Sequence, residues 1–138
     1  MANSKSIGVA FLDQDIIGAD YVYAAGEIGY SAAGQGTVTQ ATSKSTGVTL
    51  NKSAGQITMN NAALAAATNV TFTLTNSTLS AKDVLILNVS GAATSGAYNC
   101  WVSSMSAGSA TITLRNITAA TSLSEAVVIN FAIIHGAA

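Results

Sequence analysis

The chain has 138 residues, of which 49% are hydrophobic and 8% are charged, and its formal net charge is -1. That length suits one domain, and the hydrophobic content excludes an intrinsically disordered chain. The few basic residues form no stripe, so we expect no nucleic-acid partner; they are Lys5, Lys44, Lys52, Lys82 and Arg115. A neutral surface rich in hydroxyl groups suits proteins packed side by side in a large assembly, where repeated like charges would repel one another.

The cysteine count and the apolar runs limit where the chain is expected to work. Cys100 is the only cysteine, which excludes an intrachain disulfide and favours folding in a reducing cytosol. The apolar run 7–12 is short for the core of a signal peptide, so we expect no export signal. The most hydrophobic run, 126–134, is far shorter than the about 20 residues that span a bilayer as a helix, and we expect no membrane partner.

The composition changes near Gly34-Gln-Gly36. Residues before this point hold four of the six acidic residues, three of the four tyrosines and several short apolar clusters separated by glycine. We predict that residues 1–36 form an N-terminal arm and that residues 37–138 form a β-sandwich body. The arm either folds as one or two hairpins or stays extended and docks on a neighbour, which would cover its apolar clusters.

In the body, strand signals recur about every ten residues, as in sandwiches and barrels. The first two predicted strands could pair, and the alanine-rich run 61–68 is expected to be a connection or a single turn. Eight strands without a long helix predict an all-β fold, an antiparallel jelly-roll-like β-sandwich whose first and last strands can be adjacent. The predicted strands are 38–43, 47–51, 56–60, 70–75, 83–89, 97–102, 110–115 and 126–134.

Two predicted strands are apolar on both faces, unlike 70–75 and 110–115, in which apolar residues alternate with Thr or Arg. In 126–134 one face carries Val127, Ile129, Phe131 and Ile133, and the other carries Val128, Asn130, Ala132 and Ile134. We predict that 83–89 and 126–134 are neighbours or symmetry-related partners, and that Asn130 finds a polar partner there. The candidate seam between subunits consists of Val84, Ile86, Val128, Asn130 and Ile134.

The acidic residues and the single histidine form no recognisable metal site. Asp13-Gln-Asp15-Ile-Ile-Gly18 begins like an EF-hand loop, but Ile17 replaces the third oxygen ligand and Ala24 replaces the bidentate Glu. A less regular site with Asp20 or Glu27 stays open. His135 cannot build a two-histidine zinc site within one chain. It is expected at a strand end with no acid or nucleophile tied to it by a motif, although threefold symmetry would gather three copies.

The remaining candidates also have structural interpretations. Cys100 has no CxxC partner and is expected to be a small buried hydrophobe. Tyr98 and Trp101 could stack on a sugar ring, but an odd separation places them on opposite faces of a strand, so at least one belongs to the core. The Asn-x-Ser/Thr triplets at Asn51, Asn69, Asn76, Asn88 and Asn116 are attributed to chance. We expect no catalytic residue, no metal, no cofactor and no enzymatic activity.

Three phrases of the body carry a family resemblance: 38–51, VTQATSKSTGVTLN; 55–60, GQITMN; and RNIT at 115–118 followed by SLSEAVVINFAII at 122–134. They resemble a β-module of structural proteins in tailed bacteriophages, most like small capsid decoration (cement) proteins and some tail-fibre parts. The resemblance implies a homotrimer of jelly-roll-like subunits, made in the host cytoplasm. It would sit at threefold or quasi-threefold sites on the outer capsid surface and clamp the major capsid protein after expansion.

The leading hypothesis is therefore a structural virion protein that stabilises the phage head. In this interpretation, arm side chains contact the capsid or neighbouring subunits; these are Phe11, Leu12, Ile16, Ile17, Tyr21 and Tyr23. The alternative is a tail-fibre or receptor-binding module that contacts host glycans through Tyr98 and Trp101.

Overall fold

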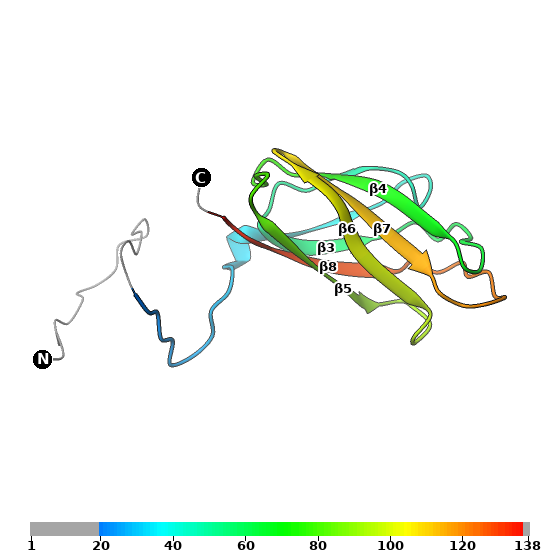
Figure 1. The fold of residues 1–138 in the computed structure, drawn as a ribbon, viewed down its shortest axis with the longest axis horizontal. Helices are drawn as coiled ribbons and strands as arrows, with labels where there is room; N and C mark the ends of the chain where they lie inside the picture. Colours follow the sequence, from blue (N-terminus) through cyan, green and yellow to red (C-terminus); the bar gives the residue numbers. More distant parts are fainter. Residues whose placement is uncertain (1–19, 137–138) are drawn as a thin grey trace, which may run out of the picture.

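The computed structural model describes residues 20–136, which form a two-layer β-sandwich (Figure 1). One sheet has the strand order β1-β3-β8-β5 and the other β2-β4-β7-β6, so the predicted all-β sandwich of eight strands is confirmed. A short 3-10 turn, η1 (Ala32–Gly34), precedes the first strand. The strands are β1 (Gln35–Thr39), β2 (Val48–Thr49), β3 (Ala54–Thr58), β4 (Asn69–Thr75), β5 (Val84–Gly91), β6 (Tyr98–Ser106), β7 (Ser109–Asn116) and β8 (Val128–Ile134).

The sheets are mixed rather than purely antiparallel, since β1 pairs with β3 in parallel and β2 pairs with β4 in parallel. The reason is that the chain alternates between the two sheets from β1 to β4. The chain reverses its direction each time it crosses to the other sheet. β3 therefore runs in the same direction as β1, and β4 in the same direction as β2, so each pair is parallel. The expected pairing of the first two strands is wrong, because β1 and β2 lie in different sheets. β3 also separates β1 from β8, so the first and last strands are not adjacent.

Other local predictions are confirmed. β5 and β8 are antiparallel neighbours, in register from Val84 opposite Ile134 to Val89 opposite Ile129, with a bulge before Gly91. Residues 61–68 form a connection with one isolated bridge, Leu64 to Leu123. The turn through Gly108 joins β6 to β7, and its φ of +79° belongs to the left-handed region that glycine adopts without strain.

The core lies between the sheets and draws on both. On β8, all four predicted inward residues are almost fully buried: Val127 just before the strand, then Ile129, Phe131 and Ile133. The opposite sheet contributes the predicted inward side chains Phe72, Leu74, Ala110, Ile112 and Leu114, all buried, and a half-buried Val70. Each large aliphatic or aromatic side chain buried in this way stabilises the fold by roughly 1.5 to 3 kcal/mol.

Candidate functional site

The outer face of the β1-β3-β8-β5 sheet carries an apolar patch. Val84 and Ile86 of β5 and Ile134 of β8 are 57%, 49% and 57% exposed. Val84 lies directly opposite Ile134, and Ile86 lies opposite Ala132, so the three large side chains share one face of an antiparallel pair. We call Val84, Ile86 and Ile134 the outer patch. The other two predicted seam residues, half-buried Val128 and exposed Asn130, lie in the first half of β8 on the same face.

Asn130 finds its polar partners within its own chain. Its Oδ1 accepts hydrogen bonds from Gln56 Nε2 at 3.0 Å and from Ser90 Oγ at 2.9 Å. Gln56 and Asn88 flank Asn130 on the neighbouring strands, which makes a polar row across the sheet. The outer face is therefore divided into an apolar end at the start of β5 and a polar middle.

The inner arm, which we define as residues 20–29, is exposed at every position. It extends away from the body (Figure 1). Tyr21, Val22, Tyr23 and Ile28 are 61% to 89% exposed, and the rings of Tyr21 and Tyr23 stack with centroids 5.9 Å apart. The other predicted contact residues, Phe11, Leu12, Ile16 and Ile17, lie outside the described residues, as do Asp13 and Asp15.

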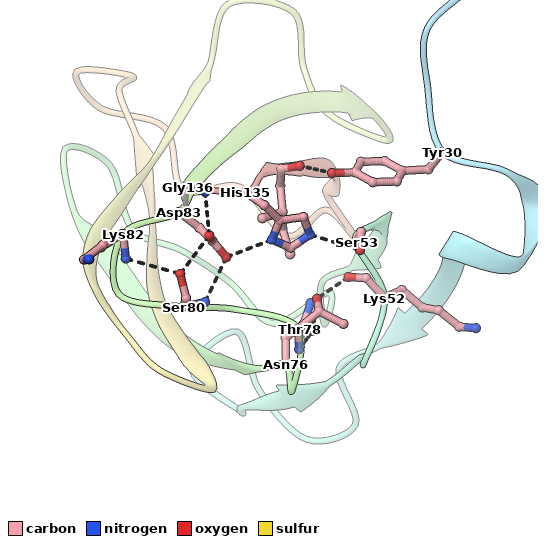
Figure 2. Close-up of polar contacts among 11 residues, drawn as sticks. Tyr30, Lys52, Ser53, Asn76, Thr78, Ser80, Lys82, Asp83, His135 and Gly136 are labelled. Atoms are coloured by element: carbon pink, nitrogen blue, oxygen red, sulfur yellow. Dashed lines mark hydrogen bonds and ion pairs between the residues drawn. The ribbon is translucent and has the colours of Figure 1, made fainter. Parts of the chain in front are cut away.

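The arm is attached to the body beside the end of β8. The Tyr30 hydroxyl donates a hydrogen bond to the Ile133 carbonyl, as Figure 2 shows. Gln35 Nε2 donates to the Tyr30 carbonyl at 2.7 Å. Because Ile133 directly precedes Ile134, the point of attachment lies next to the outer patch.

A hydrogen-bonded cluster, which was not predicted from the sequence, connects the start of β5 with the end of β8 (Figure 2). His135 Nδ1 lies 3.1 Å from Asp83 Oδ2, and His135 Nε2 lies 3.4 Å from Ser53 Oγ. The Asp83 side chain is 1% exposed and the His135 side chain 44% exposed. The Asp83 carboxylate also accepts hydrogen bonds from the Ser80 N–H, the Ser80 hydroxyl and the Gly136 N–H.

These contacts set the charge state of Asp83. The Ser80 backbone N–H, aided by the Ser80 hydroxyl, the Gly136 N–H and His135, holds the pKa of Asp83 far below its usual value, although burial acts in the opposite direction. The carboxylate thus stays ionised and closes the turn before β5 while holding the residues after β8. Gly136 fits closely there, since an added Cβ would lie 2.4 Å from the Lys82 carbonyl oxygen.

The order of contacts from Ser53 through His135 to Asp83 resembles that of a serine-hydrolase triad. A triad needs donors for an oxyanion and a space in which the reacting carbonyl fits next to the serine. Neither of the two hollows described below includes Ser53 or His135. Every hydrogen bond to Asp83 joins a strand end or a turn, so the cluster acts as a fastener between the start of β5 and the end of β8.

Two open hollows lie elsewhere on the body. One, of about 500 Å³, lies between β5 and β6 and is lined by Leu87, Val89, Tyr98, Cys100 and the loop 91–96. Burial raises the pKa of the Tyr98 hydroxyl, as does the Glu125 carboxylate, and burial raises the pKa of the half-buried Cys100 thiol. The other hollow, of about 520 Å³, lies beside η1 and includes Gln56 and Asn130.

Tyr98 and Trp101 do not form a joint surface. Tyr98 faces the hollow between β5 and β6, whereas Trp101 is 37% exposed on the opposite face of β6. Cys100 packs against the core as predicted, but it is half-buried rather than buried and also lines the hollow between β5 and β6. Among residues 20–136, no three His, Cys, Asp or Glu side chains gather in a way that could hold a metal ion.

Two of the Asn-x-Thr triplets prove to be structural units. Asn76 and Asn116 are fully buried at the ends of β4 and β7. Each Oδ1 accepts hydrogen bonds from the N–H and the hydroxyl of the threonine two residues later, Thr78 or Thr118. Their Nδ2 groups donate to backbone carbonyls far away in the sequence, so the side chains are not available for glycosylation.

Lys44 is buried, which the sequence did not indicate. Its side chain is enclosed at 3% exposure, and Nζ donates to the carbonyls of Asn60 and Glu125. Burial lowers the pKa of Lys44, against a smaller opposing effect of Glu125. Gln40 completes this connection by donating to the Lys44 and Thr46 carbonyls and accepting from the Asn60 N–H.

Comparison with known proteins gives no relative: no family model, no curated protein and no solved structure matches this chain. In the part of the chain that the structure describes, no helix has the length and apolar character needed to cross a membrane.

Proposed function

We propose that this protein is a structural virion protein of a tailed bacteriophage, a decoration protein that binds the outer surface of the head as a homotrimer and stabilises it. The observation that carries the proposal is the concentration of exposed apolar side chains on the inner arm and the outer patch. Among the described residues, Trp101 and Ile117 are the other exposed large hydrophobic side chains, and the chain as a whole is weakly charged. Contiguous exposed apolar surface marks sites of interaction between proteins.

The proposed work is mechanical. A protein that binds only the assembled, expanded head stabilises that state through linkage, because separating the capsid proteins then also requires release of the bound trimer. The net charge of -1 allows many copies to pack closely without strong mutual repulsion. No bound cofactor or catalytic step enters this proposal, and the Ser53–His135–Asp83 cluster has a structural role in it.

The arm provides the contact with the major capsid protein in this proposal. Its outer part includes the apolar side chains of Phe11, Leu12, Ile16 and Ile17. Burying such side chains against a partner contributes roughly 1.5 to 3 kcal/mol each before the cost of ordering the segment. Several of them together are needed for stable attachment.

The test is binding of the purified full chain to expanded heads that lack it, measured by co-sedimentation. We expect the double variant Ile16→Ala/Ile17→Ala to bind at least tenfold more weakly while keeping the oligomeric state of the original protein. Ile117→Ala is the matched control, because Ile117 is an exposed isoleucine of the body, outside the arm. Unchanged binding of the double variant would reject the role of the outer arm.

Electron microscopy of virions decides between head and tail. Density for the protein on the head surface is the expected result. Density on the tail, together with binding to a glycan array, would instead support the tail-fibre or receptor-binding alternative. Since Tyr98 and Trp101 face opposite sides of β6, the described part of the chain offers no paired aromatic platform from these two residues.

A further inference from the structure

The exposed large hydrophobic side chains of residues 20–136 are concentrated in two places. Four belong to the inner arm (Tyr21, Val22, Tyr23 and Ile28) and three form the outer patch (Val84, Ile86 and Ile134). Only Trp101 and Ile117 lie elsewhere. Two exposed apolar surfaces on one chain suggest that each covers the other in the assembled protein.

The outer patch alone is too small to hold two copies together. Its three aliphatic side chains are each about half exposed, which leaves on the order of 250 Å² per copy, whereas a stable interface buries roughly 800 Å² per partner. A face-to-face contact between two patches therefore needs a further contribution. The inner arm provides one, since its two tyrosines and two aliphatic residues expose more apolar surface than the patch does.

The direction of the arm favours a neighbouring copy over its own body. Tyr30 fixes the base of the arm beside Ile133, and the segment before it leaves the body with every residue exposed (Figure 1). Ten extended residues reach at most about 33 Å. That length exceeds the about 14 Å across a four-stranded sheet, so the arm is long enough to cross the whole sheet of a subunit packed beside its base.

β5 offers a suitable place for an added strand. It is the edge of its sheet, with β8 as its only partner there, and its first half carries Val84 and Ile86. The hollow in front of β6 is lined by the second half of β5, from Leu87 onward. An extended segment along the first half would satisfy unpaired backbone groups and place alternate side chains beside Val84 and Ile86 on the same face. Tyr21 and Tyr23 are two residues apart and stack on each other, so both rings lie on one side of the segment, as in an extended strand.

We propose that the inner arm of one copy binds along the first half of β5 of a neighbouring copy and covers its outer patch. The inference rests on the proposed homotrimer. Because each copy has both an arm and a patch, such a contact is head-to-tail and closes into a ring when the rotation between copies is 120°. The outer arm, which comprises the residues before residue 20, then remains available to the capsid.

Complementation between two defective variants tests this arrangement. The arm variant is Tyr21→Ser/Tyr23→Ser/Ile28→Ser, and the patch variant is Val84→Thr/Ile86→Thr/Ile134→Thr, in which threonine retains strand propensity. Ile117→Thr is the control, since Ile117 has the same 49% exposure as Ile86 but lies outside both surfaces. Mass is measured by sedimentation velocity and folding by circular dichroism.

We expect each variant alone to be a folded monomer and the control to be a trimer. An equimolar mixture of the arm and patch variants should form a dimer of one copy of each, because one intact arm meets one intact patch. A trimeric arm variant, or a mixture that stays monomeric while both components are folded, would overturn the proposal. If the wild-type protein is a monomer and the arm variant melts at a lower temperature than the wild type, the arm covers the patch of its own chain. That result would also overturn the proposal.

A cross-link gives a second test that keeps the chain nearly intact. In a Cys100→Ala background, Tyr23→Cys and Ile86→Cys proteins are mixed under oxidising conditions. A disulfide-linked heterodimer is the expected product, and failure to form it in a trimeric mixture would contradict the proposed contact. Loss of head binding by a protein that still passes both tests would reject the proposed function alone.

Discussion

Asn116 provides the most direct test of how the body is held together. It is fully buried and makes four side-chain hydrogen bonds. Nδ2 donates to the carbonyls of Leu64 at 2.9 Å and Thr121 at 2.8 Å, and Oδ1 accepts from the N–H and the hydroxyl of Thr118. The side chain thereby connects the end of β7 with the connection from β3 to β4, at Leu64, and with the connection from β7 to β8, at Thr118 and Thr121.

The cost of Asn116→Ala follows from the groups that it leaves behind. The Leu64 carbonyl still accepts from the Leu123 N–H, and the Thr121 carbonyl still accepts from the Thr118 hydroxyl. The Thr118 N–H loses its acceptor. One unsatisfied donor costs about 1 to 3 kcal/mol, and the loss of the other bonds adds about 1 kcal/mol, so we expect a destabilisation of about 3 kcal/mol.

Urea unfolding, followed by Trp101 fluorescence and circular dichroism at one fixed protein concentration, measures this cost. With a denaturant slope of about 1.5 to 2 kcal/mol per molar, the midpoint should fall by about 1.5 to 2 M. Asn61→Ala is the control, because Asn61 is exposed in the connection that precedes β4; it should change stability by less than about 0.5 kcal/mol. A cost below about 1 kcal/mol for Asn116→Ala would refute the reasoning.

Asn116→Asp sharpens the test. Aspartate keeps an acceptor for Thr118 but turns a second oxygen toward the carbonyls of Leu64 and Thr121, in a buried place that disfavours charge. The pKa of this carboxyl should therefore be higher in the folded than in the unfolded state, so the variant should gain stability as the pH falls through the folded value toward the unfolded value of about 3.9. At pH 7 it should be less stable than Asn116→Ala. The opposite order would mean that the two donated bonds contribute little.

Two further predictions concern pH. The pKa of Asp83 is lowered in the folded state, so the stability that this group contributes is complete above its unfolded pKa of about 3.9 and is lost as the pH falls through the folded pKa. In a His135→Gln background, the difference in melting temperature between proteins with Asp83 and with Asp83→Asn should therefore shrink from pH 5 to pH 2. A constant difference would contradict this. Burial lowers the pKa of Lys44, so the unfolded chain binds more protons between the folded value and about 10.4, and stability contributed by this group rises with pH. The stability of the original protein minus that of Lys44→Met should therefore increase from pH 8 to pH 10, and a flat or falling difference in urea unfolding would count against it.

Local patterns in the sequence predict the strands and their inner faces well. The alternation Val70-Thr-Phe-Thr-Leu-Thr75 places Phe72 and Leu74 in the core because neighbouring side chains of a strand point to opposite faces. The sheet order is a different matter. The parallel pairs β1–β3 and β2–β4 follow from the chain alternating between layers, and no residue of those strands specifies this locally.

Burial of Lys44 shows the same limit for a single side chain. A lysine between two short strands is normally solvated, and nothing within ten residues of it suggests otherwise. Its burial depends on the carbonyls of Asn60 and Glu125, which are 16 and 81 positions away. Only the tertiary fold brings these acceptors to one place, so the sequence pattern could not predict the contact.

The contact between Asp83 and His135, in contrast, was within reach of the sequence. The two strands that are apolar on both faces were predicted to be neighbours, and they are. Antiparallel pairing of Val84 with Ile134 places the preceding residue of one strand beside the following residue of the other. Asp83 and His135 occupy those two positions, an acid and a base at the paired ends. A register assigned from the hydrophobic runs would therefore have joined them.

That same pairing links the fastener to the proposed assembly. Asp83 directly precedes Val84 and His135 directly follows Ile134, so the cluster fixes the two strand ends that present the outer patch. Tyr30 attaches the arm at the neighbouring residue, Ile133. The outer patch and the base of the arm therefore both lie beside the contact between Asp83 and His135. Loosening the cluster should weaken trimer formation even though Asp83 is buried and touches no neighbouring copy in the proposed arrangement. The variant Asp83→Asn tests this expectation. A folded Asp83→Asn protein that trimerises as tightly as the original would show that the cluster does not contribute to trimer formation.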